Sequence, residues 1–279
     1  MTRLLLCTDL DRTLLPNGES PESAGARDRF AALVARPEVT LAYVSGRHLA
    51  LVEQAIEQYG IPRPDWVIGD VGSRMYQWQP PGHWLESTAW QVEIATDWPG
   101  LSSGAISEAF TTIEDLTLQG QDRQSTYKLS YFLPLGVDLG SLRRVMEARL
   151  RELQARSSWI YSVDEQAQVG LLDILPERAT KLHAVEFLMQ QQGFLPSSTV
   201  FAGDSGNDLP ILVSPVPSVL VANAHPDVLR DASAGSSQRG TDQSLYVAKG
   251  DFLGMNGNYS AGILEGLVHF HPETKAWIL

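Results

Sequence analysis

Short apolar runs alternate with longer amphipathic stretches over the first 70 residues of the chain. The apolar run 4–8 predicts a buried strand. The stretches that follow it predict, in turn, a helix, a strand, a helix and a strand, over residues 22–35, 39–44, 48–59 and 66–68. Strands and helices that alternate in this way favour a parallel sheet with helices on its faces.

The pattern changes after the turn Pro80-Pro81-Gly82 and returns after Pro176. The intervening segment predicts a strand, a long helix and two further strands, over 127–133, 139–156, 159–163 and 170–175. Beyond it, strands are predicted at 199–202 and 218–221, and helices at 180–192, after 208, after 226 and at 260–269. The polar stretch 231–244 predicts a surface loop. We therefore expect an α/β, Rossmann-like core with a parallel sheet (residues 1–82 and 177–279), interrupted by a smaller α+β domain (residues 83–176).

Composition and charge narrow the possible partners. The chain has 279 residues, 43% hydrophobic and 19% charged, which is ordinary for a globular protein. Its formal charge of -12 is spread without a lysine-arginine patch, which argues against nucleic acid or an anionic membrane as a partner. The single cysteine, Cys7, lies in an apolar run, and no signal-peptide or membrane-spanning pattern is present. We therefore expect a cytoplasmic protein.

Two carboxylates, Asp9 and Asp11, follow the first predicted strand. Residues i and i+2 of a strand point the same way, so both carboxylates would face one crevice beyond the end of the strand. Like charges at this distance need a cation or a shared proton. One carboxylate could attack an electrophile while the other transfers a proton. A polar turn or a helix cap is the alternative interpretation.

Two further candidate phosphate-binding segments lie at the end of a predicted strand and at the start of a predicted helix. Ser45-Gly46-Arg47 follows the second strand, and its hydroxyl and backbone N–H groups could cradle a phosphate. The alternative is that Ser45 only caps the next helix. Lys181 begins a helix after the inserted segment and could neutralise a phosphoryl oxygen. The alternative there is a solvated lysine.

The segment 203–208 offers oxygen ligands in a glycine-rich turn, with Asp204, Asn207 and Asp208 after a predicted strand. Such hard oxygen donors suit Mg²⁺, although a plain Asx-rich turn has the same composition. Asn223, after the next strand, could hydrogen-bond a substrate or the metal loop. The sequence lacks zinc-ligand spacing, a Walker lysine loop and a Gly-x-Ser-x-Gly elbow. The interpretations as a zinc hydrolase, a P-loop protein or a serine esterase therefore lose their main support.

Taken in chain order, these motifs resemble those of the haloacid dehalogenase (HAD) superfamily, in the group with a large α/β cap. Within it the chain is most similar to the sucrose-phosphate phosphatase family, on the segments Val71-Gly72-Ser73, Lys128-Leu129-Ser130-Tyr131, Asp173-Ile174-Leu175-Pro176 and Ala261-Gly262-Ile263-Leu264-Glu265-Gly266. Two positions depart from the common pattern. Arg12 stands where the most common first motif of the HAD superfamily has glycine, although the sucrose-phosphatase branch is less strict at this position. Leu182 replaces the glycine that usually follows the lysine.

The resemblance implies a role for each motif residue. Asp9 would be the nucleophile that forms an aspartyl-phosphate, and Asp11 would be the acid and then the base. Mg²⁺ would be held by the side chains of Asp9 and Asp204 and the backbone carbonyl of Asp11, with Asp208 and Asn207 around these ligands. The phosphoryl oxygens would be bound by Ser45, Gly46 and Lys181.

The inserted domain would, by the same resemblance, be a cap that closes over a sugar and supplies specificity. We expect substrate contacts from Arg47, Lys128 and Asn223, and the alternative for Lys128 is an exposed strand lysine. Five tryptophans lie in or beside the insertion and would either stack on a sugar or fill its core: Trp78, Trp84, Trp90, Trp98 and Trp159.

We therefore expect a Mg²⁺-dependent phosphatase that converts sucrose 6-phosphate to sucrose and phosphate. Mannosyl- or glucosyl-glycerate phosphates are alternative substrates, and a phosphohexomutase-type phosphotransferase is an alternative reaction. A non-catalytic partner of a glycosyltransferase, or a phospho-accepting receiver domain, is a third hypothesis. Association with a sugar-phosphate synthase is the expected protein partnership.

Overall fold

The computed structural model describes residues 3–165 and 167–278, and the chain divides into two compact units. One unit, here called the core unit, runs to Glu86 and resumes at Lys181, and the other, the inserted unit, is Ser87–Thr180. Residues 1–2, 166 and 279 fall within the predicted domain ranges but lie outside the described residues. The structure confirms the expected α/β fold class, a core sheet with an inserted α+β unit.

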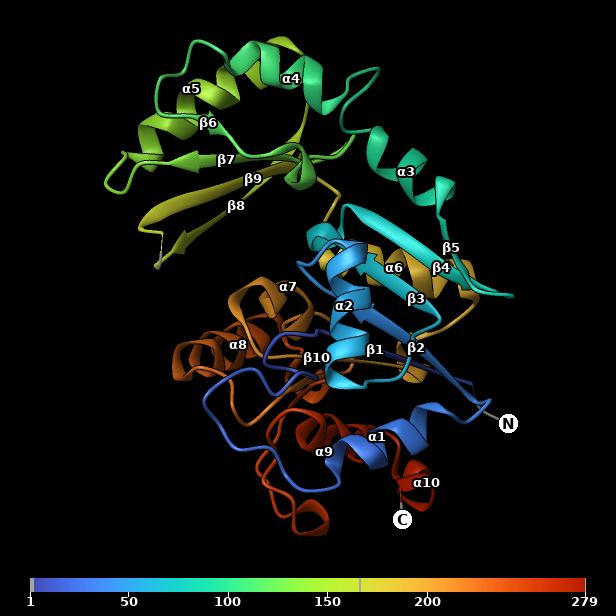
Figure 1. Cartoon of the computed structure of the whole chain (residues 1–279). Helices are drawn as coiled ribbons and strands as arrows, with labels where there is room; N and C mark the ends of the chain where they lie inside the picture. Colours follow the sequence, from blue (N-terminus) through green and yellow to red (C-terminus); the bar gives the residue numbers. More distant parts are fainter. Residues whose placement is uncertain (1–2, 166, 279) are drawn as a thin grey trace. The chain divides into compact units, whose positions relative to one another are not determined.

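The core unit is built on an eight-stranded sheet with the order β12-β11-β10-β1-β2-β3-β4-β5 (Figure 1). The strands are β1 (Leu4–Thr8), β2 (Val39–Val44), β3 (Trp66–Gly69), β4 (Arg74–Gln79), β5 (His83–Glu86), β10 (Thr199–Gly203), β11 (Ser218–Leu220) and β12 (Leu245–Val247). Six of them are parallel, and β4 and β5 add an antiparallel hairpin at one edge. The parallel sheet predicted from the alternating pattern is therefore confirmed, while β4, β5 and β12 were not predicted.

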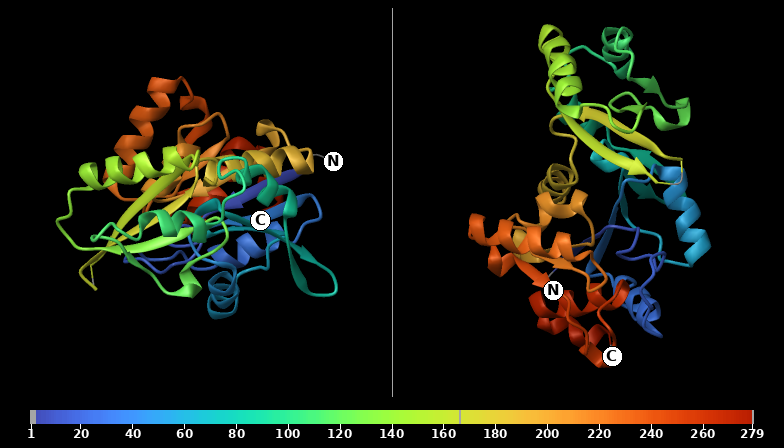
Figure 2. Two further views of the ribbon diagram at one scale, coloured as in Figure 1. Left: turned by 90° about the horizontal axis from the view of Figure 1, so that it is seen from above. Right: turned by 90° about the vertical axis from the view of Figure 1, so that its left-hand side faces the viewer.

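Helices cover both faces of this sheet, which explains why β1 is buried at every position. Leu4 and Leu6 belong to a cluster with residues of three helices, α1 (Ala26–Val34), α2 (Leu49–Tyr59) and α9 (Ser260–Phe270). Because side chains alternate along a strand, Leu5 and Cys7 point to the opposite face, where they are also fully buried. Figure 2 shows α2 and α6 (Lys181–Gln192) on opposite sides of the sheet.

The remaining helices of the core unit are α7 (Leu209–Leu212), α8 (Pro226–Arg239) and α10 (Lys275–Ile278). The loop predicted over 231–244 is wrong, because most of it continues α8. Ala232 and Ser236, four residues apart, bury one face of this helix, and Gly240 ends it in the left-handed conformation with φ 69°. Among the helices of residues 3–165 and 167–278, none is long and apolar enough to cross a membrane.

The inserted unit has its own sheet and its own core. Its four strands are antiparallel in the order β6-β7-β9-β8, namely β6 (Thr117–Leu118), β7 (Leu129–Leu133), β8 (Ser157–Asp164) and β9 (Val169–Pro176). Its helices are α3 (Thr88–Ala95), α4 (Ser103–Phe110) and α5 (Leu139–Glu152). One apolar cluster joins α4 and α5 to strands β7 and β9.

Two of the five tryptophans highlighted by the sequence are fully buried. Trp90 is inaccessible to solvent, and Trp98 packs in the apolar cluster and donates from Nε1 to Ser157 Oγ at 2.9 Å. Trp159 packs against the same cluster. The core-filling alternative therefore describes these three side chains.

The predicted boundary at residue 83 is four residues early. His83–Glu86 forms β5, which pairs with β4 and belongs to the core sheet. The hairpin forms because the turn around Pro80 and Pro81 reverses the chain and brings Trp84 against Trp78, with ring centroids 5.0 Å apart. Trp78 and Trp84 thus belong to the core unit.

Candidate active site in the core unit

The motif residues lie where three neighbouring parallel strands end. Asp9 follows β1, Ser45 follows β2 and Asp204 follows β10, and β1 pairs with both other strands. Parallel strands present their carboxyl ends at the same edge of the sheet, and ligands of such folds bind there. The sheet register therefore brings together residues that are up to 195 positions apart in sequence.

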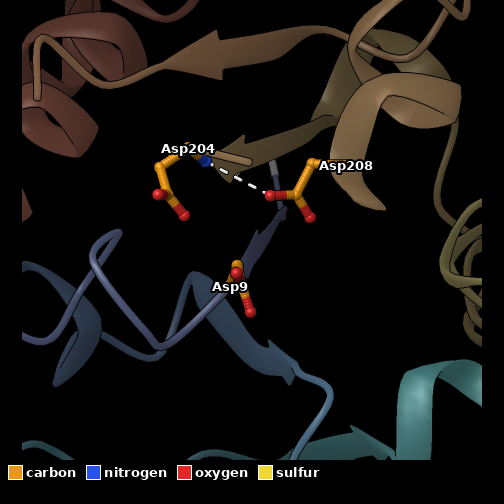
Figure 3. A group of neighbouring side chains, drawn as sticks. All are labelled: Asp9, Asp204 and Asp208. Carbon is orange, nitrogen blue, oxygen red and sulfur yellow. Dashed lines mark hydrogen bonds between the residues drawn. The ribbon is translucent and has the colours of Figure 1, made fainter. Parts of the chain in front are cut away.

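Three carboxylates form a buried cluster at this edge: Asp9, Asp204 and Asp208 (Figure 3). One oxygen from each lies within 4.8 Å of the others, and each residue exposes 4% or less of its surface. Oxygens this close together repel one another unless a cation or a proton lies among them. The interpretation of residues 203–208 as a plain polar turn does not account for this arrangement.

Lys181 supplies a positive charge inside the cluster. Its Nζ lies 2.8 Å from Asp208 Oδ1, 3.2 Å from Asp9 Oδ1 and 3.1 Å from Asn207 Oδ1. The side chain is 2% exposed, so the alternative of a solvated lysine is wrong. Lys181 is the first residue of α6, and the Leu182 that follows it leaves these contacts intact.

Burial and neighbouring charges perturb the acidity of these groups. Desolvation, opposed by Lys181, raises the pKa of Asp9 to about 7. Desolvation and the charge of Asp208 raise the pKa of Asp204 to about 6. Burial alone would lower the pKa of Lys181, but Asp208 and Asp9 raise it above its ordinary value, so the lysine remains charged.

Asp208 organises the loop that carries Asp204. Its Oδ2 accepts hydrogen bonds from the backbone N–H groups of Asp204 and Ser205, both at 3.2 Å. A Cβ atom at position 203 would lie 2.6 Å from Asp208 Oδ2, so only glycine lets the carboxylate approach the backbone. The glycine of this motif is therefore required by the loop itself.

Asp11 lies nearer the surface and is held by two side chains. Arg47 forms a bidentate ion pair with it, with Nη2 to Oδ1 at 2.6 Å and Nε to Oδ2 at 2.8 Å. Asn17 Nδ2 donates to Oδ1 at 2.6 Å. Burial would raise the pKa of Asp11, but the Arg47 hydrogen bonds and charge outweigh it and lower the pKa. Arg47 thus contacts a motif carboxylate in this structure.

Ser45 is buried and does not cap a helix. The residue at the N-cap of α2 is His48, so the capping alternative for Ser45 is wrong. Its Oγ accepts from the backbone N–H of Arg47 at 3.2 Å, and its carbonyl accepts from the N–H of Val71 at 3.1 Å. Among the described residues, a Cβ at Gly46 would meet one atom within 4 Å, Val71 Cγ2 at 3.9 Å, so open space lies beside this glycine.

Asn223 supports the loop that carries Asp11 and Arg12. Its Nδ2 donates to the carbonyl of Arg12 at 2.6 Å, and its Oδ1 accepts from the N–H of Tyr259 at 2.8 Å. Both ends of the amide are therefore used by backbone groups.

Three contacts of this site were not predicted from the sequence. Thr13 Oγ1 donates to Asp204 Oδ1 at 3.0 Å, Arg12 Nε lies 3.3 Å from Asp204 Oδ2, and Asn17 binds Asp11. Thr13 belongs to the first motif, whose spacing could have suggested its role. Asn17 lies in an irregular polar segment, and no sequence pattern indicates its partner.

Lys128 belongs to the inserted unit and is buried, so the alternative of an exposed strand lysine is wrong. Its Nζ lies 3.8 Å from Asp173 Oδ2 and donates to the carbonyl of Arg123 at 3.4 Å. Ser130 Oγ donates to Asp173 Oδ1 at 2.5 Å. These residues form a polar group at one end of β7 and β9.

The carboxylate cluster fits a hard divalent cation. It combines three buried oxygen donors with few cationic partners, Lys181 deep in the cluster and Arg12 at its exposed side. Mg²⁺ is held by one or two carboxylates together with water and substrate oxygens, and carboxylates from separate strand ends provide such donors.

The protein combines a parallel core sheet, an inserted unit and an aspartate-lysine cluster at the strand ends. This combination defines a phosphatase of the haloacid dehalogenase type. The chain is similar to the solved sucrose-phosphatase of Synechocystis sp. PCC6803, a structure in complex with sucrose and phosphate. The TM-score is 0.71 at 25% identity, over 97% of this chain and 99% of that one.

The family model described as sucrose-6F-phosphate phosphohydrolase matches residues 2–271, and the chain belongs to this family. It is 50% identical to a protein of Nitrosococcus oceani named as a HAD-like hydrolase, over 99% of this chain and 74% of that protein. It is 28% identical to the mannosylfructose-phosphate phosphatase of Agrobacterium fabrum, over 95% of this chain and 96% of that enzyme. The chain is therefore a phosphoric monoester hydrolase.

Proposed function

We propose that this phosphatase acts on the phosphate ester of a disaccharide, with sucrose 6-phosphate as the preferred substrate, and that it requires Mg²⁺. The observation that carries the proposal is the buried Lys181 amine between Asp9 and Asp208, in the same cluster as Asp204. This arrangement combines a carboxylate nucleophile with a fixed positive charge, as transfer of a phosphoryl dianion requires. The family match supports the choice of a sugar phosphate.

The side chains of Asp9 and Asp204 and the backbone carbonyl of Asp11 would hold the Mg²⁺, with Asp208 and Asn207 around them. The bound cation would supply charge stabilisation for the phosphoryl oxygens. Asp208 already binds Lys181 and two backbone N–H groups, which suits it to orient the other residues. Ser45, Gly46 and Lys181 would bind the phosphoryl oxygens, and the open space at Gly46 leaves room for one.

In the first step an oxygen of Asp9 attacks phosphorus, and the bond between phosphorus and the sugar oxygen breaks. Asp11 gives its proton to the departing oxygen, which leaves an aspartyl-phosphate and a free sugar. In the second step water attacks phosphorus, Asp11 takes a proton from that water, and Asp9 is restored as phosphate departs. The contact with Arg47 favours the carboxylate form of Asp11, which the second step needs. The first step needs the protonated form, so Arg47 would have to leave Asp11 for the substrate before the proton is donated.

Specificity for the sugar is assigned in this proposal to the inserted unit, with Lys128 as a residue that contacts substrate hydroxyls. Arg47 and Asn223 would contribute from the core unit. In the present structure Arg47 binds the Asp11 side chain, and Asn223 binds the backbone carbonyl of Arg12. Each side chain therefore lies beside the loop that carries Asp11, where it would contact the substrate. Lys128→Met should then raise KM for the sugar phosphate more than it lowers kcat.

The test is a phosphate-release assay with and without Mg²⁺. The panel contains sucrose 6-phosphate, mannosylfructose phosphate, mannosylglycerate phosphate, glucosylglycerate phosphate and hexose phosphates. We expect hydrolysis of sucrose 6-phosphate, its loss with EDTA, and no turnover by Asp9→Asn. Asp227→Asn, which alters an exposed carboxylate paired with Arg230, is the matched control and should remain active. An Asp9→Asn enzyme with full Mg²⁺-dependent activity would refute the mechanism.

The second candidate substrate is mannosylfructose phosphate, favoured by a relative that aligns over nearly the whole of both chains. A higher kcat/KM for this ester than for sucrose 6-phosphate would replace the preferred substrate and keep the mechanism. Isomerisation of a hexose phosphate instead of phosphate release would indicate a phosphotransferase. Association with a sugar-phosphate synthase is tested by co-purification of the two proteins and by transfer of the ester between them.

A further inference from the structure

Arg12 adopts a backbone conformation that side-chain-bearing residues rarely take. Its φ is 57°, in the left-handed region, which glycine adopts without strain. The backbone N–H donates to Asn17 Oδ1 at 2.8 Å, and the carbonyl accepts from Asn223 Nδ2 at 2.6 Å. Two asparagine side chains therefore fix both polar groups of this residue, and the surrounding structure determines the conformation.

The side chain of Arg12 extends from this fixed backbone to the carboxylate cluster. A Cβ at Gly18 would lie 3.4 Å from Arg12 Cγ and 3.5 Å from Cδ, so the stem lies alongside that glycine. Nε reaches Asp204 Oδ2 at 3.3 Å, with the arginine side chain 58% exposed and the aspartate 3% exposed. One part of the guanidinium group remains in solvent while Nε neutralises a buried carboxylate.

Both oxygens of Asp204 are engaged in this structure. Thr13 Oγ1 donates to Oδ1 at 3.0 Å, and Arg12 pairs with Oδ2. A divalent cation bound at the cluster would share the Asp204 carboxylate with the guanidinium group of Arg12. Two cations beside one carboxylate repel each other, so the occupancy of one lowers the affinity for the other.

We propose that Arg12 is a built-in counter-ion that competes with Mg²⁺ for Asp204 and sets a weaker metal affinity than the carboxylates alone would give. The inference rests on the proposed Mg²⁺ site. In the metal-free protein Arg12 offsets the charge of Asp204, and in the loaded protein it gives up this contact. The pair is partly exposed, and such pairs are modest in strength, so removal of the charge should tighten Mg²⁺ binding about two- to five-fold.

The test measures Mg²⁺ binding without substrate, by isothermal titration calorimetry of the full chain. Arg12→Gln removes the charge and retains the backbone constraint, and it should give a lower Kd. Arg12→Lys retains a cation and should resemble the wild type more closely. Arg230→Gln removes an arginine that pairs with exposed aspartates elsewhere on the core unit, and its Kd should not change.

A second measurement follows thermal unfolding in EDTA and in saturating Mg²⁺. Arg12→Gln should lower Tm in EDTA, because the cluster loses a counter-ion, and the rise in Tm on adding Mg²⁺ should exceed that of the wild type. Added NaCl should reduce the difference between the two proteins, because the Arg12 side chain is largely exposed. Arg12→Gly, which adopts a positive φ without strain, repeats the comparison if the glutamine variant does not fold.

Each outcome bears on a different claim. Unchanged or weaker Mg²⁺ binding by Arg12→Gln, with normal binding by the wild type, would overturn the role of Arg12 and leave the proposed function standing. Absence of Mg²⁺ binding by the wild-type protein would overturn the metal site and this inference together. Tighter binding by Arg12→Gln and unchanged binding by Arg230→Gln is the result that the structure predicts.

Discussion

Replacement of Lys181 by methionine removes the charge at the centre of the carboxylate cluster while keeping a side chain of similar length. Nζ lies within 3.2 Å of oxygens of Asp9, Asp208 and Asn207, and the side chain is 2% exposed. The variant therefore leaves Asp9 and Asp208 buried beside an apolar group. We expect a less stable protein that has lost its phosphatase activity.

The size of the effect follows from the burial of the pair. Removing one partner of a buried ion pair costs about 3–5 kcal/mol, because the remaining charge is left without compensation. For a chain of this size, 1 kcal/mol changes Tm by roughly 2–4 °C, so the metal-free variant should unfold roughly 6–20 °C below the wild type. Loss of a preorganised positive charge should reduce kcat by about 10²-fold or more.

The assay compares thermal unfolding in EDTA and in Mg²⁺, together with phosphate release. Mg²⁺ should raise Tm of Lys181→Met more than Tm of the wild type, because the cation compensates carboxylates that the lysine no longer neutralises. Activity should not return, because the phosphoryl group still lacks its fixed cation. Lys275→Met, at an exposed lysine of α10, is the matched control.

A Lys181→Met protein that unfolds in EDTA within about 2 °C of the wild type would refute the assigned strength of these contacts. Full activity of the same variant would refute the role of Lys181 in the reaction. The two results are independent, since the first concerns the free enzyme and the second concerns substrate.

Three further predictions concern residues that are not members of the carboxylate cluster. Glu265→Gln should lower the free energy of unfolding by about 1.5–3 kcal/mol, because the buried carboxylate accepts from Tyr246 Oη and from the backbone N–H groups of Lys249 and Gly250, and a urea titration measures this. Gly266→Ala should destabilise α9 against β11, because its Cβ would lie 2.3 Å from Val219 Cγ2, whereas Gly104→Ala in α4 has no contact closer than 3.6 Å and should be neutral or stabilising. Equal unfolding midpoints for the two glycine variants would contradict this packing. Burial raises the pKa of the Cys7 thiol, so a thiol reagent at pH 8 should modify the cysteine only after denaturation, and fast reaction of the native protein would show that the site is accessible.

The sequence predicted the parallel core because most positions of its strands are apolar and polar residues follow the strand ends. Asp9, Ser45 and Asp204 were recognised because each directly follows such a run, and the sheet order brings them to one edge. The hairpin β4–β5 was missed because its strands mix polar and aromatic residues without clear alternation. The helix predicted after residue 226 is present as α8, but its second half, residues 231–239, was predicted as a loop because serine and glycine have low helix propensity. Two small side chains, Ala232 and Ser236, provide its buried face.

The contacts that tune the site were harder to predict than its position. The pairs Arg47–Asp11 and Arg12–Asp204 join residues 36 and 192 positions apart, and arginines are solvated in most settings. Asn17 and Asn223 each stabilise the loop that carries Asp11 through two side-chain hydrogen bonds, and these leave no periodic pattern in the sequence. Such contacts depend on the placement of loops, which local sequence patterns do not determine.

The central position of β1 also affects how the protein is made. Its partner on one side, β2, follows within 35 residues, but its partner on the other side, β10, is synthesised after the whole inserted unit. During translation the nascent chain therefore carries an incomplete sheet in which β1, four of whose five residues are apolar, still has one unpaired edge. Such an edge promotes association between chains, and long-range pairing of this kind closes slowly. The inserted unit, which has its own apolar core, can fold during this interval, and the enzyme acquires its active site only when residues 199–208 leave the ribosome.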